Sequence, residues 1–119
     1  MNTSAALERF VSVYNEPGSP VYPLYADEVI WQERPGGRGG DRDALFTALR
    51  ASREKWTATL ESVSMEVDGD LGVLNSLWRA EPKSDPALQP VVSDLLWVFR
   101  FDAAGLITTE FDYSFRRAS

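Results

Sequence analysis

Residues 107–115 read Ile-Thr-Thr-Glu-Phe-Asp-Tyr-Ser-Phe, and the alternation of apolar and polar side chains in this stretch decides the fold. Successive side chains of a β-strand point to opposite faces. One face would carry Ile107, Thr109, Phe111, Tyr113 and Phe115, and the other Thr108, Glu110, Asp112 and Ser114. The second face therefore holds two carboxylates. An ordinary half-buried antiparallel strand with its polar face in water has the same pattern, so the neighbouring sequence must indicate where that face lies.

A second apolar strand precedes this one, and the two together are typical of a β-hairpin. Residues 91–101 are rich in β-branched and aromatic side chains, and the turn at residues 102–105 ends in Gly105, which suits a positive φ. One face of this strand carries Leu95, Trp97, Phe99 and Phe101, and the other carries Val92, Leu96 and Val98. Such a sheet needs cover on both sides. Helices can cover one face, and a second subunit can cover the other.

Composition limits the possible partners and chemistries. The 119 residues predict one domain, spanning 1–119. A net charge of −6 argues against binding to nucleic acid or to an anionic membrane. The chain has no cysteine and no histidine, which excludes disulfides, thiolate and imidazole metal ligands, and the Ser-His-Asp triad. Acid–base chemistry would have to use Asp, Glu, Tyr, Lys or a bound water.

Nothing in the sequence predicts secretion or membrane insertion. The first nine residues lack the charged region and long apolar run of a signal peptide, and no apolar stretch reaches the length of a membrane helix.

The Gly-rich residues 35–40 lack the Lys-Ser/Thr of a phosphate-binding loop, and we expect them to form a loop at the rim of a pocket. We therefore expect a cytoplasmic protein without a metal or a cofactor.

The remaining patterns predict helices first and strands afterwards. Apolar residues at helical spacing predict a helix from about residue 4 to Tyr14, and Ser19-Pro20 predicts a short second helix through about Tyr25. Residues 28–33 predict a strand, and Asp41 can cap a third helix that ends near Trp56. Residues 57–67 and 71–80 then predict two long strands joined by a turn.

This order resembles the nuclear-transport-factor-2-like superfamily, which includes SnoaL-like polyketide cyclases, ketosteroid isomerases and limonene epoxide hydrolases. Three passages carry the resemblance: Leu-Tyr-Ala-Asp-Glu-Val-Ile-Trp at 24–31, Gly-Asp-Arg-Asp-Ala-Leu at 40–45, and Phe-Arg-Phe-Asp-Ala-Ala-Gly-Leu-Ile at 99–107. The resemblance implies an α+β fold in which a cone-shaped, curved antiparallel sheet wraps around three N-terminal helices and a mostly apolar pocket. It also implies a homodimer formed through the outer face of the sheet, with Leu95, Trp97, Phe99, Phe111, Tyr113 and Phe115 as candidate interface residues.

The same resemblance suggests individual site residues. Asp112-Tyr113 is similar to the Arg-Asp-Tyr-Phe-Asp stretch of limonene epoxide hydrolase, whose first Asp is the base that activates water. Trp31-Gln32-Glu33 stands where that enzyme has Tyr-Gln-Asn, which holds the water. The middle strand, however, has Leu-Trp-Arg at 77–79 in place of the required Arg-x-Asp. The catalytic positions of ketosteroid isomerase hold Phe10, Arg34 and Trp97, so neither mechanism carries over whole.

Physical chemistry leaves two interpretations of the carboxylates open. In an apolar pocket, burial and a nearby like charge raise the pKa of a carboxyl group, which suits it to act as an acid or base near neutrality. Alternatively, Glu110 or Asp112 forms a structural ion pair with Arg34, Arg79 or Arg100. We predict Asp112, Glu110 and Glu33 as catalytic residues, and Tyr14, Trp31, Asn75, Ser76 and Trp78 as substrate-binding residues.

Two functions follow from this site. The first is a cofactor-free enzyme in which Asp112 moves a proton during cyclisation, isomerisation or water addition on a small apolar metabolite. The second is a non-catalytic, dimeric ligand-binding or accessory domain that uses the same pocket, because a carboxylate without a matched acid is an incomplete catalytic set.

Overall fold

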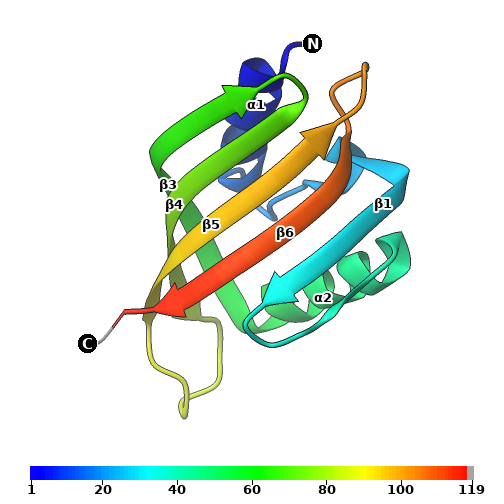
Figure 1. Cartoon of the computed structure of the whole chain (residues 1–119). Helices are drawn as coiled ribbons and strands as arrows, with labels where there is room; N and C mark the ends of the chain where they lie inside the picture. Colours follow the sequence, from blue (N-terminus) through cyan, green and yellow to red (C-terminus); the bar gives the residue numbers. More distant parts are fainter. Residues whose placement is uncertain (118–119) are drawn as a thin grey trace.

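The computed structural model describes residues 1–117 (Figure 1). Within this range the chain forms two α-helices, α1 (Thr3–Tyr14) and α2 (Arg42–Lys55), and a short 3-10 helix, η1 (Tyr22–Leu24). The same range contains six strands, which are β1 (Tyr25–Arg34), β2 (Gly39–Gly40), β3 (Trp56–Asp68), β4 (Leu71–Pro82), β5 (Val91–Phe101) and β6 (Ile107–Arg116). The fold class is α+β, as predicted.

The strands form one sheet in the order β2-β1-β6-β5-β4-β3. The last four strands make an antiparallel meander, as the sequence predicts. β1, however, runs parallel to β6 and places Trp31 opposite Glu110 and Glu33 opposite Asp112. The sheet is therefore mixed, and the prediction of a wholly antiparallel sheet is wrong. A local alternation pattern identifies a strand, but it does not indicate which distant strand will be its neighbour or in which direction the two will run.

The prediction of three N-terminal helices is also wrong, because the second one does not form. Residues 22–24 make only the 3-10 helix η1, and Tyr25 already begins β1. Pro20 and Pro23 have no backbone N–H to donate, so this short segment lacks the hydrogen bonds that an α-helical turn requires. The helix predicted after Asp41 forms as α2, with the Asp41 side chain accepting a hydrogen bond from Ala44 N at 3.1 Å.

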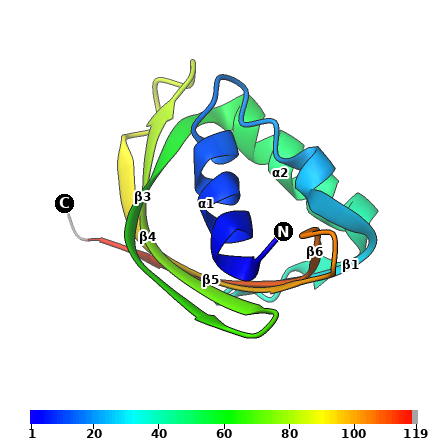
Figure 2. The ribbon, with the colours of Figure 1, turned by 90° about the horizontal axis from the view of Figure 1, so that it is seen from above.

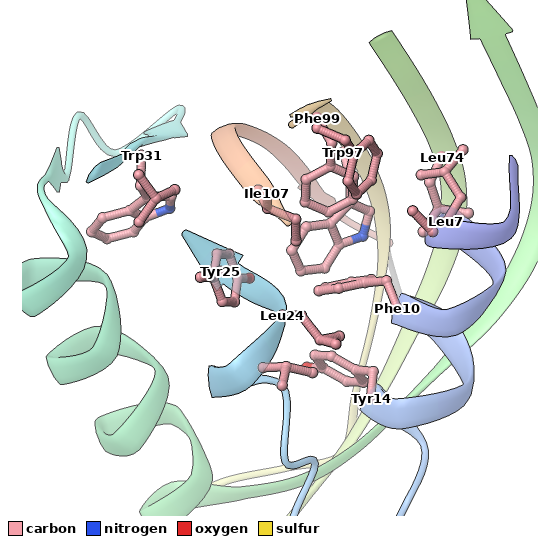
Figure 3. Close-up of a cluster of buried hydrophobic side chains, with 14 of the residues drawn as sticks. Leu7, Phe10, Tyr14, Leu24, Tyr25, Trp31, Leu74, Trp97, Phe99 and Ile107 are labelled. Carbon is pink, nitrogen blue, oxygen red and sulfur yellow. The ribbon is translucent and has the colours of Figure 1, made fainter. Parts of the chain in front are cut away.

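The sheet curves around α1, and α2 closes the other side of the hollow (Figure 2). The apolar face of α1 buries Leu7, Phe10 and Tyr14. The Phe10 ring lies 4.9 Å from that of Phe99 and 5.1 Å from that of Trp97, measured between centroids. Figure 3 shows these side chains meeting those of β1 in the space between the two helices. The core is therefore aromatic and lies on the concave side of the sheet.

Gly72 allows α1 to approach the sheet closely. Leu7, which is fully buried, packs against β4 at this position. A Cβ atom on residue 72 would lie 3.0 Å from two side-chain atoms of Leu7. Any larger residue there would have to displace the Leu7 side chain, because close-packed interiors leave little room for an added methyl group.

A bulge in the β5–β6 hairpin decides which side chains of β6 face inward. Arg100 pairs with Thr109, whereas Phe101 pairs with Ile107, so β6 has one extra residue at this point. Ile107 is consequently buried on the same side as Glu110 and Asp112. The predicted strict alternation, which placed Ile107 with Phe111, is wrong there. Beyond the bulge the alternation holds, and both carboxylates lie on the concave side.

The convex face is apolar, but its residues differ in part from the predicted interface. Leu95, Trp97 and Phe99 point into the hollow and take no part in that face, which is a correction to the prediction. Their neighbours Leu96 and Val98 face outward instead, because side chains alternate along β5. Cross-strand pairing aligns the outward residues in rows that contain Val73, Leu77, Leu96, Val98, Phe111, Tyr113 and Phe115, and we call this set the convex patch.

Candidate functional site

A cavity of about 580 Å³ lies between α2 and the concave side of the sheet. Its lining includes Tyr14 of α1, the α2 side chains Leu45, Ala48 and Leu49, and Leu95 of β5. All four tryptophans of the chain, Trp31, Trp56, Trp78 and Trp97, also line it. Glu110, Asp112 and Ser114 of β6 lie on one wall. The cavity is thus an aromatic and aliphatic chamber with two carboxyl groups.

Glu110 and Asp112 are nearly inaccessible to solvent, with exposed fractions of 1% and 9%. The Tyr25 hydroxyl donates a hydrogen bond of 2.5 Å to Glu110 Oε1, and Trp31 Nε1 donates one of 3.1 Å to Asp112 Oδ2. The second oxygen of each group, Glu110 Oε2 and Asp112 Oδ1, is buried and has no hydrogen-bond donor within residues 1–117. Each carboxyl group is therefore held at one oxygen by a side chain of β1, and among the described residues its remaining partner is the neighbouring carboxyl group.

The two carboxyl groups interact so closely that they titrate as a pair. Burial is the largest cause that raises the pKa of Glu110, to about 7, and the Asp112 and Tyr25 side chains oppose that rise by hydrogen bonding. Burial, followed by the charge of Glu110, raises the pKa of Asp112 well above its ordinary value. Two ionised carboxylates side by side in a buried site of low dielectric constant would repel each other. Burial and mutual repulsion therefore both disfavour the simultaneous ionisation of the two groups.

The alternative of a structural ion pair is wrong for the residues described. Arg79 pairs with Glu61 at 3.3 Å, and Arg100 pairs with Asp70 at 2.9 Å, both at the surface. Arg34 is exposed at the end of β1. No ion pair within residues 1–117 involves either buried carboxyl group.

Glu33 lies at the rim of the cavity rather than beside the buried pair. Its carboxylate accepts two hydrogen bonds from Arg38, at 3.0 and 2.8 Å. Pro35 and Arg38 also line the cavity, so the Gly-rich segment forms part of the rim, as predicted. Glu33 therefore forms an ion pair with Arg38, whereas neither Glu110 nor Asp112 forms an ion pair with a described residue.

The predicted substrate-binding residues divide into three groups. Tyr14, Trp31 and Trp78 line the cavity, and Trp78 Nε1 donates a hydrogen bond of 2.9 Å to the Tyr14 hydroxyl. Ser76 is buried but is engaged elsewhere, since it donates to the Leu95 carbonyl and accepts from Trp97 Nε1. Asn75 is exposed on the convex face, where it contacts Ser64 at 3.1 Å. The assignment of Asn75 to the pocket is wrong, because the two neighbours Asn75 and Ser76 point to opposite faces of β4.

Tyr25 is the residue that the sequence-based prediction missed. It begins β1 rather than ending a helix, and its hydroxyl reaches Glu110, 85 positions later in the chain. Only the parallel pairing of β1 with β6 brings these residues together, and no local pattern carries that information. Trp56 and Trp97 also line the cavity, although the sequence analysis named Trp56 only as the end of a helix and Trp97 as a candidate interface residue.

Within residues 1–117, no group of three or more acidic side chains comes close enough together to hold a metal ion. In the same part of the chain, neither helix has the length and apolar character needed to cross a membrane.

Comparison of the whole chain with solved structures identifies its fold. No protein-family model matches the sequence, and a comparison with curated proteins gives no match. Solved structures do match. An epoxide hydrolase of the limonene-epoxide-hydrolase-like type from Mycobacterium tuberculosis has a TM-score of 0.74 and 20% sequence identity, and the match covers 93% of this chain and 80% of that one.

Two further matches have the same architecture. IdmH of Streptomyces antibioticus, a proposed polyketide cyclase, has a TM-score of 0.79 at 14% identity, over 96% of this chain and 92% of that one. A protein of ketosteroid isomerase-like fold from Catenulispora acidiphila, solved in complex with trimethylamine, has a TM-score of 0.74 at 13% identity, over 91% of this chain and 83% of that one. The chain therefore has the nuclear-transport-factor-2-like fold that its sequence patterns predict.

Proposed function

We propose that this protein is a cofactor-free enzyme that catalyses proton transfer on a small, largely apolar metabolite, with Asp112 as the proton-transfer residue and Glu110 as its partner. The observation that carries the proposal is the pair of buried carboxyl groups, each with one oxygen that has no donor among residues 1–117, in a cavity lined by aromatic side chains. A fold that only needed to be stable would not keep two such groups in its interior, because burying a charged or unpaired polar group costs free energy.

One proton shared between the two groups gives the pair two complementary roles. The ionised group can remove a proton from a substrate carbon, and the protonated group can donate one to a developing oxyanion. Trp31 and Tyr25 fix the orientation of the carboxyl groups through their hydrogen bonds. The apolar walls exclude water and so keep the pKa of the pair near the pH at which it would work.

These features favour isomerisation or cyclisation over hydrolysis. Both reactions begin when a base removes a proton next to a carbonyl group, and both end when an acid returns one. Water addition to an epoxide would instead need a group that positions water and a second group that protonates the leaving oxygen. The Arg-x-Asp that limonene epoxide hydrolase requires on the middle strand has no counterpart on β4, where Arg79 faces outward to Glu61.

A chromogenic substrate tests for this base without knowledge of the natural one. The ring of 5-nitrobenzisoxazole opens when a base removes its C–H proton, and the product absorbs visible light. We expect the wild-type protein to accelerate this reaction with a rate that rises with pH as the coupled carboxyl pair loses its proton, because burial raises the pKa of both groups. Asp112→Asn should abolish the acceleration, whereas Glu61→Gln, which changes an exposed carboxylate on β3, should not alter it. An Asp112→Asn variant as active as wild type would refute the proposal and favour the ligand-binding or accessory role.

We further propose that a second copy of the chain covers the convex patch. The patch extends over β4, β5 and β6, and Phe115 is 62% exposed within it. Asn75 and Asp94 stand in the same rows, but clustered outward-facing apolar side chains of this kind are typical of protein interfaces. Two copies related by a two-fold axis would each bury the same set of side chains, which is the commonest arrangement of soluble homodimers.

A further inference from the structure

The aromatic walls of the cavity offer ring surface rather than hydrogen-bond donors. Three of the four lining tryptophans already direct their indole N–H groups to protein acceptors. Trp31 donates to Asp112, Trp78 donates to Tyr14, and Trp97 donates to Ser76. The part of these three indoles left for a ligand is therefore the π system, which carries negative charge on its faces and attracts cations.

Among residues 1–117, the fully buried polar atoms of the cavity lining that lack a hydrogen-bond partner are both carboxyl oxygens. Glu110 Oε2 and Asp112 Oδ1 are buried without a donor among the described residues, and both belong to side chains that are more than nine-tenths buried and line the cavity. A neutral apolar ligand would leave these oxygens unpaired, and an anionic ligand would be repelled. A positively charged group is the one kind of ligand that both the oxygens and the rings would attract.

Within the part of the chain that the structure describes, no cationic side chain forms an ion pair with the two carboxyl groups. The charged side chains in or near the cavity, besides the pair itself, are Glu33, Arg38, Arg53 and Lys55. Arg38 is committed to Glu33, and Arg53 lies over the rings of Tyr14 and Tyr22. Lys55 is exposed at the end of α2 and forms no ion pair with the two carboxyl groups. The neighbouring tyrosines Tyr14 and Tyr25 keep their protons, because burial raises the pKa of both.

We propose that the ligand of this cavity is an organic cation, namely an apolar molecule whose amine or quaternary ammonium nitrogen lies against the free oxygens of Glu110 and Asp112 and the faces of the tryptophan rings. This inference rests on the proposed function in one respect, which is that the cavity is the place where a small molecule binds. It adds the charge of that molecule, which the fold does not specify.

Cation binding must be linked to the protonation of the pair. A positive charge beside the two carboxyl groups stabilises their ionised forms, so binding expels a proton. Affinity for a permanent cation should therefore rise with pH through the pKa of Glu110, about 7. One released proton corresponds to an increase of at most about tenfold in affinity per pH unit.

Two molecules of the same shape separate charge from hydrophobicity. Phenyltrimethylammonium and tert-butylbenzene differ in a positive nitrogen against a neutral carbon, and the cation has no proton that titrates. We expect the wild-type protein at pH 8 to bind phenyltrimethylammonium about tenfold or more tightly than tert-butylbenzene, as measured from the indole N–H signals in NMR titrations. Calorimetry in buffers of different ionisation enthalpy should detect proton release near pH 7.

Variants locate the effect. The double variant Glu110→Gln/Asp112→Asn keeps the shape of both side chains and should lose the preference for the cation, while Glu61→Gln, an equal change of charge at the surface, should keep it. The single variant Glu110→Gln serves if the double variant does not fold. Equal or tighter binding of tert-butylbenzene by wild type, failure of both molecules to bind, or a preference that survives the double variant would overturn the inference.

The two proposals fail separately. A wild-type protein that opens 5-nitrobenzisoxazole but shows no preference for the cation would keep the proton-transfer function and lose the cationic ligand. Selective binding of phenyltrimethylammonium without ring opening would support the cationic ligand and reject the enzyme.

Discussion

Glu110→Gln measures what it costs the protein to keep an acid inside the cavity. Glutamine has the same shape as glutamate but no charge, and its carbonyl oxygen can still accept the hydrogen bond from Tyr25. The substitution therefore removes the titration of residue 110 while leaving its packing in place. Its effect on stability should depend strongly on pH, which a purely structural role would not produce.

The magnitude follows from the pKa of Glu110. In the unfolded chain the carboxyl group ionises near 4.5, whereas in the folded protein it ionises at about 7. As pH rises through this interval, the unfolded state loses its proton first, so wild-type stability falls and then levels off above pH 7. A difference of this size corresponds to about 3 kcal/mol in the free energy of unfolding. The loss of the Glu110 charge also brings the pKa of Asp112 closer to its ordinary value. The calculated free-energy difference is therefore a lower bound on the effect of the substitution.

Urea denaturation of wild type and variant at pH 4 and at pH 8 provides the measurement. We compare the difference in the free energy of unfolding between the two proteins at each pH. The contributions of all titratable groups that the substitution does not affect then cancel. Relative to wild type, the variant should be more stable at pH 8 than at pH 4 by about 3 kcal/mol. A stability difference that is the same at both pH values, or that favours wild type more at pH 8, would refute the buried acid and with it the shared proton.

Three further predictions concern the site, the interface and the core. Asp112→Asn should leave the protein as stable as wild type, or more stable, in thermal unfolding at pH 7, because burial raises the pKa of Asp112; a clear loss of stability at pH 7 but not at pH 4 would contradict this. Wild type should sediment as a dimer at micromolar concentration and Leu96→Glu as a monomer, because a buried carboxylate in the convex patch would lack a partner; a wild-type monomer would rule out the interface. Phe10→Ala should lower the free energy of unfolding by about 3–5 kcal/mol in urea, since Phe10 contacts three other core rings; a loss below about 1 kcal/mol would show that the core does not depend on this ring.

Local patterns in the sequence predict most of the secondary structure. The helical spacing of Leu7, Phe10 and Tyr14 and the capping position of Asp41 correctly locate α1 and α2. The alternation in residues 91–101 and the turn at Gly105 correctly predict the hairpin of β5 and β6. These features depend on interactions between residues close in sequence, so a short window contains the necessary information.

The sequence-based prediction fails for features that depend on residues far apart in the chain. The parallel pairing of β1 with β6 and the hydrogen bond from Tyr25 to Glu110 join segments about eighty positions apart. The bulge near Thr109 shifts Ile107 to the inner face. The sequence of β6 gives no sign of it, because the predicted pattern of alternating side chains runs through this point without a break. Asn75 was assigned to the wrong face because the sequence of β4 carries polar and apolar residues on both sides. The orientation of Glu110 and Asp112 was predicted correctly, since the resemblance indicated which face of β6 lies inside.

The parallel pairing of β1 with β6 also has a consequence for the order in which the chain folds during synthesis. β1 is complete by residue 34, but its long neighbour in the sheet ends only at residue 116. Until residue 116 has left the ribosome, β1 can pair only with the two-residue strand β2. Closing so long a loop is entropically costly and slow. Closure of the β1–β6 ladder is therefore expected among the last folding events, and the pocket with its carboxyl pair is assembled in that same event.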